Sequence, residues 1–194
     1  MKYVYIEAEN NKQPEYHFLA TYAAHIGLKD VQFVPIAGKD KLGMLKVSMM
    51  DKVLAQDTVA ILFDADYPNI GGGFEKRKED ILQQLRAYNI PAKVFLWPNN
   101  QSDGDFERML EEIVRKDMHQ LFFDCFRDYE LCVAKEYTTP NRKGKFHTFV
   151  HAQRGLSNTQ KRKVGSGNWL FDNSALWNLD SPYLNALSSF LLSL

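Results

Sequence analysis

Apolar residues form short runs typical of buried strands, and these runs alternate with longer stretches in which apolar positions recur at helical spacing. Strand-like runs cover residues 3–7, 31–36, 58–64 and 92–97. Between them, apolar residues return every three or four positions, as on the inner face of an amphipathic helix. Alternation of this kind predicts an α/β fold whose parallel sheet has about four strands, joined by right-handed helical crossovers.

The expected helices follow the strands in turn. The first ends at Gly27, the second covers about residues 44–55, the third carries Ile81 to Tyr88, and the fourth covers residues 105–116. Ala37 and Gly38 are expected to close the second strand. Beyond about residue 118 the alternation stops. A mainly helical segment is expected there, followed by a basic tract and a last helix that has Ser181 as its N-cap and Pro182 at its first position.

This pattern suggests two parts, an α/β domain over residues 1–117 and a helical extension over residues 118–194, packed together as one unit. The chain has 194 residues, of which 45% are hydrophobic and 13% aromatic, which is typical of globular proteins. No apolar run is long enough for a transmembrane helix, and no signal peptide is apparent. We therefore expect a cytoplasmic protein that does not enter a membrane.

The two cysteines, Cys125 and Cys132, lie seven residues apart in a segment expected to be helical. A helix would separate them by about 10 Å along its axis, which is too far for a disulfide. A reducing compartment fits this spacing. Buried structural cysteines are the commoner explanation for such residues.

Carboxylates gather where the expected strands end. Asp64 and Asp66 follow the most apolar strand, Glu7 ends the first strand, and Glu107 begins the helix after the fourth. Residues i and i+2 of a strand point to the same side, so the two aspartates are expected to project together. The carboxyl ends of parallel strands share one edge of the sheet, where ligands bind. These acids therefore predict a site for Mg²⁺ or Mn²⁺, whereas each acid alone could simply cap a turn or a helix.

The net charge is zero, yet the charges are unevenly distributed. Residues 137–171 contain no Asp or Glu but seven cations, namely Arg142, Lys143, Lys145, Arg154, Lys161, Arg162 and Lys163. Cations that hold a polyanion beside carboxylates that hold a metal would suit an enzyme acting on phosphodiesters. We expect nucleic acid to contact Arg142, Lys143 and Lys145. The alternative is a solvated surface loop, whose glycines would make part of it mobile.

The order of these motifs resembles the Toprim fold of topoisomerases, bacterial primases and overcoming-lysogenization-type nucleases, and more closely a small bacterial Toprim-like family of unassigned function. Family members carry a pattern like Val-Glu-Gly-x-x-Asp at the end of the first strand. Here the segment is Ile6-Glu7-Ala8-Glu9-Asn10-Asn11, so the glutamate matches while Ala8 and Asn11 replace glycine and aspartate. The Asp-x-Asp pair matches as Phe63-Asp64-Ala65-Asp66, with Pro68 in the place of a third aspartate.

A further block, Trp97-Pro98-Asn99-Asn100 followed by Gly104-Asp105-Phe106-Glu107, resembles the nuclease-like members, and the likeness covers about residues 2–117. The resemblance implies a Mg²⁺-dependent, nuclease-like activity in which Asp64 and Asp66 bind the metal, Glu107 binds at a second site, and Glu7 is a ligand or a general acid or base. It also implies a lysine that stabilises charge on the phosphoryl group, for which the candidate is Lys145.

Other interpretations remain open from the sequence. Asn11 binds Mg²⁺ less well than an aspartate would, so a noncatalytic module that binds nucleic acid or a partner is one alternative. An Asp-x-Asp pair also serves nucleotide-sugar transferases and some phosphatases, although Pro68 stands where such phosphatases have threonine. Zinc could be bound by Cys125, Cys132, His147 and His151.

Aromatic residues gather near the end of the chain, namely Trp169, Phe171, Trp177 and Tyr183. Such rings can stack on bases. Beside a helix as apolar as the last one, we expect them instead to close the core or to form the interface of a homodimer.

Overall fold

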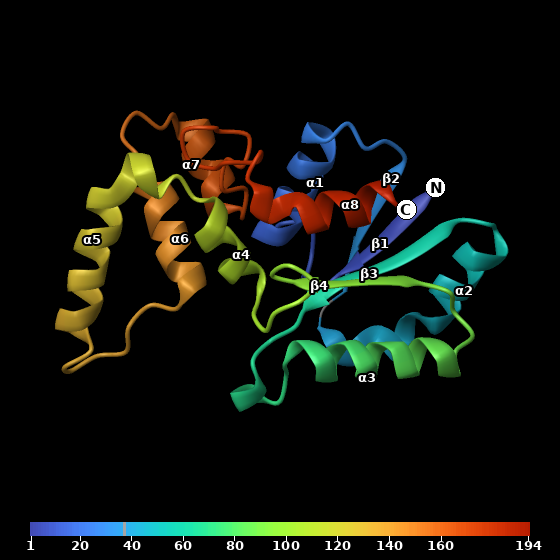
Figure 1. The fold of residues 1–194 in the computed structure, drawn as a ribbon. Helices are drawn as coiled ribbons and strands as arrows, with labels where there is room; N and C mark the ends of the chain where they lie inside the picture. The colour runs from blue at the N-terminus through green and yellow to red at the C-terminus, as the bar shows by residue number, and fades with distance from the viewer. Residues whose placement is uncertain (37) are drawn as a thin grey trace.

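A single parallel sheet organises the protein, as the computed structural model shows for residues 1–36 and 38–194 (Figure 1). Its strands are β1 (Lys2–Ile6), β2 (Val31–Pro35), β3 (Thr58–Asp64) and β4 (Lys93–Trp97), in the order β2-β1-β3-β4. Every pairing is parallel, so the predicted α/β class is confirmed. Ala37, expected to help close the second strand, lies outside the described residues.

Helices connect the strands and extend the chain beyond the sheet. They are α1 (Pro14–His25), α2 (Lys46–Leu54), α3 (Phe74–Ala87), α4 (Phe106–Ile113), α5 (Lys116–Val133), α6 (Arg142–His151), α7 (Asn158–Gly165) and α8 (Asn185–Leu192). Short 3-10 segments are η1 (Lys39–Leu45), η2 (Pro68–Ile70) and η3 (Pro182–Leu184). The described helices include none long and apolar enough to cross a membrane.

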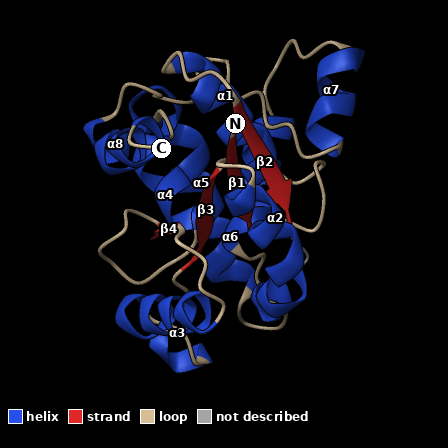
Figure 2. Ribbon diagram, turned by 90° about the vertical axis from the view of Figure 1, so that its right-hand side faces the viewer, coloured by secondary structure: helices blue, strands red, loops and turns tan. Residues whose placement is uncertain are grey.

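The two faces of the sheet bury alternate residues of each strand. On β3, Ala60 and Leu62 pack with helices α1, α4 and α8, whereas Ile61 and Phe63 pack with helices α2 and α3. The strands are apolar on both sides for this reason, as expected of a parallel sheet covered by helices. In both views α3 and α8 lie on opposite sides of the sheet (Figures 1 and 2).

The fourth predicted helix ends three residues earlier than expected, at Ile113. Helix α4 ends at Ile113 because Val114 takes an extended conformation and bridges to Trp177, after which α5 begins at Lys116. The amide of Arg115 donates to the carbonyl of Leu176 across 2.9 Å. Contacts with a segment some sixty residues later therefore set this boundary, and helical spacing within the segment carries no sign of it.

Helices α6 and α7 cover about half of the basic tract. Ser157 begins α7 with a capping box, in which its side chain accepts from the Gln160 amide and the Gln160 side chain accepts from the Ser157 amide. This reciprocal pairing satisfies two amides that a helix start leaves without partners. The alternative of a loop is thus wrong for α6 and α7, which carry six of the seven cations of the tract.

The C-terminal aromatics belong to the core. Trp169, Phe171 and Trp177 are buried, and the indole of Trp177 donates to the carbonyl of Trp169 across 2.9 Å. They pack in one cluster with strand residues such as Ile6 and Leu62. Residues 118–194 thereby share a core with the sheet, and helices α5 to α7 lie beyond the carboxyl ends of the strands (Figure 1).

Cys125 and Cys132 are free, as expected, but both are exposed on α5. The expectation of buried structural cysteines is therefore wrong. Helix α5 buries Phe126 instead, and the cysteines lie on its other side because that helix packs through its phenylalanines.

Candidate functional site

A cavity of about 280 Å³ opens at the carboxyl ends of β1 and β3. We call it the carboxylate cavity. Five acidic side chains line it, and four of them come from separate elements, namely Glu7, Glu15, Asp64 and Glu107. The strand register explains part of this, because Ile6 pairs with Leu62 and so brings Glu7 and Asp64 to the same edge. Its other lining residues are Ala8, Glu9, Gln13, Pro14, Phe106 and Lys143.

Asp64, the last residue of β3, is held by the start of α4. Its Oδ1 accepts a hydrogen bond from the amide of Phe106 across 2.9 Å. Burial raises the pKa of Asp64 well above its ordinary value, and repulsion from Glu15, Glu107 and Glu7 raises it further. The carboxylate thus lies in a place where a negative charge is costly.

Glu15 is the most buried acid of the cavity, with 7% of its surface exposed. Its Oε1 accepts from the indole nitrogen of Trp97 across 2.8 Å. Burial raises the pKa of Glu15 well above the usual range, repulsion from Glu7 and Glu107 adds to this, and the Trp97 hydrogen bond opposes it. Sequence reasoning missed this residue because an acid in the first turn of a helix usually only complements the helix dipole. Its place just after the first strand was the available signal.

Glu107 completes the group from the first turn of α4. Burial raises its pKa, as does repulsion from Asp105, while the backbone and the cations Lys143 and Arg142 act in the opposite direction. The predicted residues Glu7, Asp64 and Glu107 therefore line one cavity.

Asp66 contacts a different part of the molecule, and the expectation that it projects together with Asp64 is wrong. Strand β3 ends at Asp64, and Asp66 takes a left-handed conformation with φ of 59°. Its carboxylate pairs with Arg77 on α3 across 2.6 Å, and it does not line the carboxylate cavity. The rule that residues i and i+2 share a side holds only while the chain stays extended.

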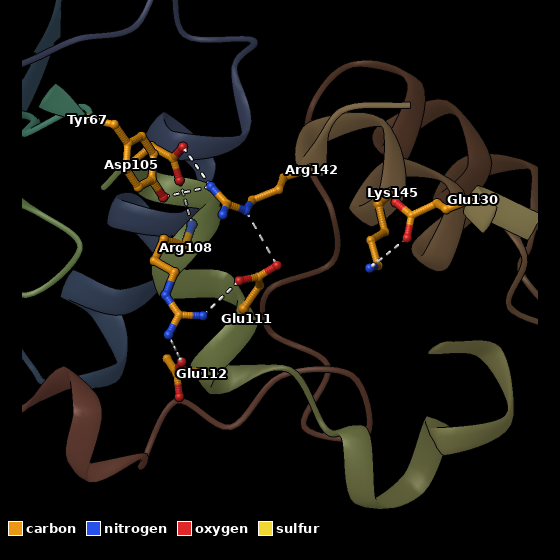
Figure 3. Close-up of polar contacts among 8 residues, drawn as sticks. All are labelled: Tyr67, Asp105, Arg108, Glu111, Glu112, Glu130, Arg142 and Lys145. Atoms are coloured by element: carbon orange, nitrogen blue, oxygen red, sulfur yellow. Dashed lines mark hydrogen bonds and ion pairs between the residues drawn. The ribbon is translucent and has the colours of Figure 1, made fainter. Parts of the chain in front are cut away.

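The predicted basic residues also separate, as Figure 3 shows for two of them. Lys145 pairs with Glu130 on α5 across 3.5 Å, and its ammonium lies over the ring of Phe126. It does not line the carboxylate cavity. Its neighbour Lys143 does line it, and its Nζ donates to Oε1 of Gln13 across 2.8 Å.

Arg142 joins α6 to α4 and to the segment after β3. Its guanidinium donates to the hydroxyl of Tyr67 across 2.7 Å and pairs with Asp105 at 3.3 Å and Glu111 at 3.5 Å (Figure 3). Asp105 is also the N-cap of α4, accepting from the amide of Arg108. Arg142 therefore positions the first turn of α6, to which Lys143 belongs.

The donor chemistry of the cavity fits a hard divalent cation. The acids that line it offer carboxylate oxygens, the ligands that Mg²⁺ and Mn²⁺ prefer, and a cation would relieve their repulsion. Within residues 1–36 and 38–194, no three His, Cys, Asp or Glu side chains are arranged as ligands around one point, and this includes the cysteines and histidines considered for zinc. Mg²⁺ usually takes only one or two carboxylates and keeps several waters, so the carboxylate cavity suits it.

Comparison with known proteins identifies no relative: no family model, no curated protein and no solved structure matches the chain.

Proposed function

We propose that the carboxylate cavity binds Mg²⁺ or Mn²⁺ and that the protein cleaves or transfers phosphodiesters of nucleic acid, as the Toprim resemblance implies. The observation that carries this proposal is the convergence of Glu7, Glu15, Asp64 and Glu107 on one cavity at the carboxyl edge of a parallel sheet. Ligands of such sheets bind at this edge.

Electrostatics favours a cation in this place. Like charges in a poorly solvated cavity repel strongly, so the group must hold protons or a positive ion. The pKa values of Asp64, Glu15 and Glu107 are raised, which means that these carboxyl groups bind protons more readily than exposed ones do. At neutral pH and millimolar Mg²⁺, the cation competes with these protons.

The residues divide between holding the metal and handling the substrate. Asp64 and Glu107 would hold the ion together with water molecules, and Glu7 would act as a general acid or base. When bound, a divalent cation polarises a phosphoryl oxygen and lowers the pKa of water. Lys143 lines the cavity and so replaces Lys145 as the candidate for stabilising charge on the phosphoryl group. Burial raises the pKa of Glu15, so this carboxyl group is a candidate for a general acid.

The proposal also includes the cytoplasm as the place of action. Two exposed cysteines without a disulfide are typical of proteins in a reducing compartment.

The test is a calorimetric titration with Mn²⁺ and Mg²⁺, combined with cleavage of labelled single-stranded and duplex DNA and RNA. Asp64→Asn keeps an acceptor for the Phe106 amide but loses the charge, and Asp51→Asn on the exposed side of α2 is the matched control. We expect Asp64→Asn alone to weaken cation binding at least about tenfold, the loss of one charged ligand, and to abolish cleavage.

Other results would point elsewhere. Cation binding without cleavage of any substrate would favour a noncatalytic module that binds nucleic acid or a partner. Equal behaviour of the two variants would exclude Asp64 as a ligand. Cation-dependent binding of a nucleotide sugar would favour the transferase alternative.

A further inference from the structure

A second cavity, of about 390 Å³, lies beside the carboxylate cavity and shares Gln13, Pro14 and Lys143 with it. We call it the basic groove. The remaining lining residues come from the loop before α1, from α6, and from α7 and its following turn, namely Lys12, Gly144, His147, Val164, Gly165, Gly167 and Trp169. No carboxylate is among these described lining residues.

The groove is built by a close contact between distant segments. Gly167 has φ of +83°, and a Cβ placed on it would lie 2.0 Å from the carbonyl oxygen of Lys12. No other residue type fits this backbone at this distance. The turn after α7 is therefore held directly against the loop that follows β1 and bears Lys12, which fixes the groove relative to the carboxylate cavity.

The charge of the lining residues indicates which kind of ligand the basic groove would bind. Lys12, Lys143 and His147 line it, and its walls from α6 and α7 belong to the tract without Asp or Glu between residues 137 and 171. Gly144, Gly165 and Gly167 add no side chain that would cover the backbone. A groove lined by lysines and without carboxylates suits the phosphates of a nucleic acid strand.

The volume and position of the basic groove limit the class of nucleic acid that it can bind. A cavity of 390 Å³ is at the lower end of small-molecule sites, so it admits about one nucleotide and no duplex. Lys143 lies at the boundary of both cavities, where a phosphate would lie if it joined a nucleotide in the groove to a phosphodiester at the carboxylates. The pair Lys143 and Gln13 spans this boundary.

We propose that the basic groove binds a single-stranded segment of nucleic acid and guides its backbone into the carboxylate cavity. This proposal rests on the proposed function for what happens at the carboxylates, but the groove itself binds the strand without a cation. The substrate class is thereby a single strand or an unpaired end, of DNA or RNA.

The experiment measures the binding of fluorescent twelve-nucleotide strands in EDTA, so that neither a cation nor cleavage contributes. Lys12→Glu/His147→Glu changes two exposed residues that line only the groove. Its matched control, Lys29→Glu/His151→Glu, makes the same charge change at exposed positions that do not line it: Lys29 lies just before β2, at the opposite edge of the sheet, and His151 is one turn further along α6.

We expect the groove variant to bind a single strand at least about tenfold more weakly, with a shallower salt dependence, because each lost phosphate contact lowers the slope by about 0.7. The control should retain most of the affinity. Melting temperatures of both variants verify that they fold. DNA and RNA strands are compared in parallel to distinguish the two sources of the strand.

Three outcomes would overturn the proposal. Equal losses in both variants would mean that only net charge matters. Tighter binding of a duplex than of a strand would exclude a strand-sized groove, and tight binding of a mononucleotide unaffected by adding a neighbour would make the groove a nucleotide pocket. Failure of the proposed function looks different, because the groove would still bind strands that are never cleaved.

Discussion

Arg77 donates from Nη2 to Oδ2 of Asp66 across 2.6 Å, and this ion pair ties the turn after β3 to α3. Only 10% of the Arg77 side chain and 20% of the Asp66 side chain are exposed. Two aspartates that are separated by one residue in the sequence thus have different surroundings. Asp64 lines the carboxylate cavity, whereas Asp66 forms an ion pair with a buried guanidinium.

Removal of Asp66 should therefore affect stability first. Asp66→Ala leaves Arg77 buried without this carboxylate, and we expect a loss of about 3 kcal/mol in the free energy of unfolding. Arg77→Met in the same chain should recover part of it, because no uncompensated charge then remains. Urea unfolding of the two single variants and the double variant measures the coupling.

Asp64 and Asp66 should differ in their effect on cation binding. Asp66→Ala should keep its affinity for Mn²⁺, unlike Asp64→Asn. A stable Asp66→Ala protein that no longer binds the cation would show instead that Asp66 is a ligand.

The buried carboxyl of Glu15 should make the metal-free protein more stable in acid than at neutral pH. Its folded-state pKa is raised above the unfolded value, so its contribution is fully present below the unfolded pKa, about 4.3, and is lost as the pH rises through the folded pKa. Asp64 and Glu107 shift in the same direction. Urea unfolding in EDTA at a series of pH values measures this dependence.

Glu15→Gln is the informative variant because the amide oxygen can still accept from Trp97. We expect it to be more stable than wild type at pH 8 and to lose that advantage toward pH 4. Glu15→Ala should instead cost about 1–3 kcal/mol by leaving the indole without an acceptor. The exposed Glu79→Gln serves as the control. An advantage of Glu15→Gln that does not vary with pH would contradict this account.

Gly167 should tolerate no side chain. Gly167→Ala places a Cβ 2.0 Å from the carbonyl oxygen of Lys12, so the turn after α7 must move. Gly155→Ala is the matched control, since Gly155 also has positive φ, at 79°, but has nothing within 4 Å. We expect the control to cost about 1 kcal/mol for its backbone conformation and Gly167→Ala to cost clearly more.

Thermal and urea unfolding compare the two glycine variants, and strand binding in EDTA follows the groove. If Gly167→Ala were as mild as Gly155→Ala, the close contact that builds the basic groove would be absent in solution.

Arg142 should act as a positioning residue for α6. Arg142→Met keeps the aliphatic stem but loses the contacts with Tyr67, Asp105 and Glu111. The side chain is 41% exposed, so we expect a loss of only about 1 kcal/mol, together with faster hydrogen exchange in the first turn of α6. Arg127→Met, whose ion pairs lie within α5, is the control that should leave α6 unchanged.

The same pair of variants separates positioning from direct contact with nucleic acid. If Arg142→Met lowered strand affinity without changing exchange in α6, Arg142 would contact the strand itself.

The sequence by itself determined the parallel sheet and the edge of it at which acidic side chains lie. Buried strands that alternate with amphipathic helices leave few topologies, because parallel crossovers are right-handed and strand ends share an edge. Glu7, Asp64 and Glu107 could be located from this reasoning alone. Helical spacing likewise indicated α3, and the apolar last helix placed Trp169 and Trp177 either in the core or in a homodimer interface.

Only the tertiary structure decided which side chains meet at that edge. The left-handed turn at Asp66, the early end of α4 at Ile113, and the position of Lys143 rather than Lys145 at the carboxylate cavity all depend on contacts with segments distant in the sequence. Glu15 became part of the site because Trp97 and the cavity surround it. Local spacing fixes where a residue lies on its own strand or helix, whereas its partners are set by packing between elements, which no local pattern encodes.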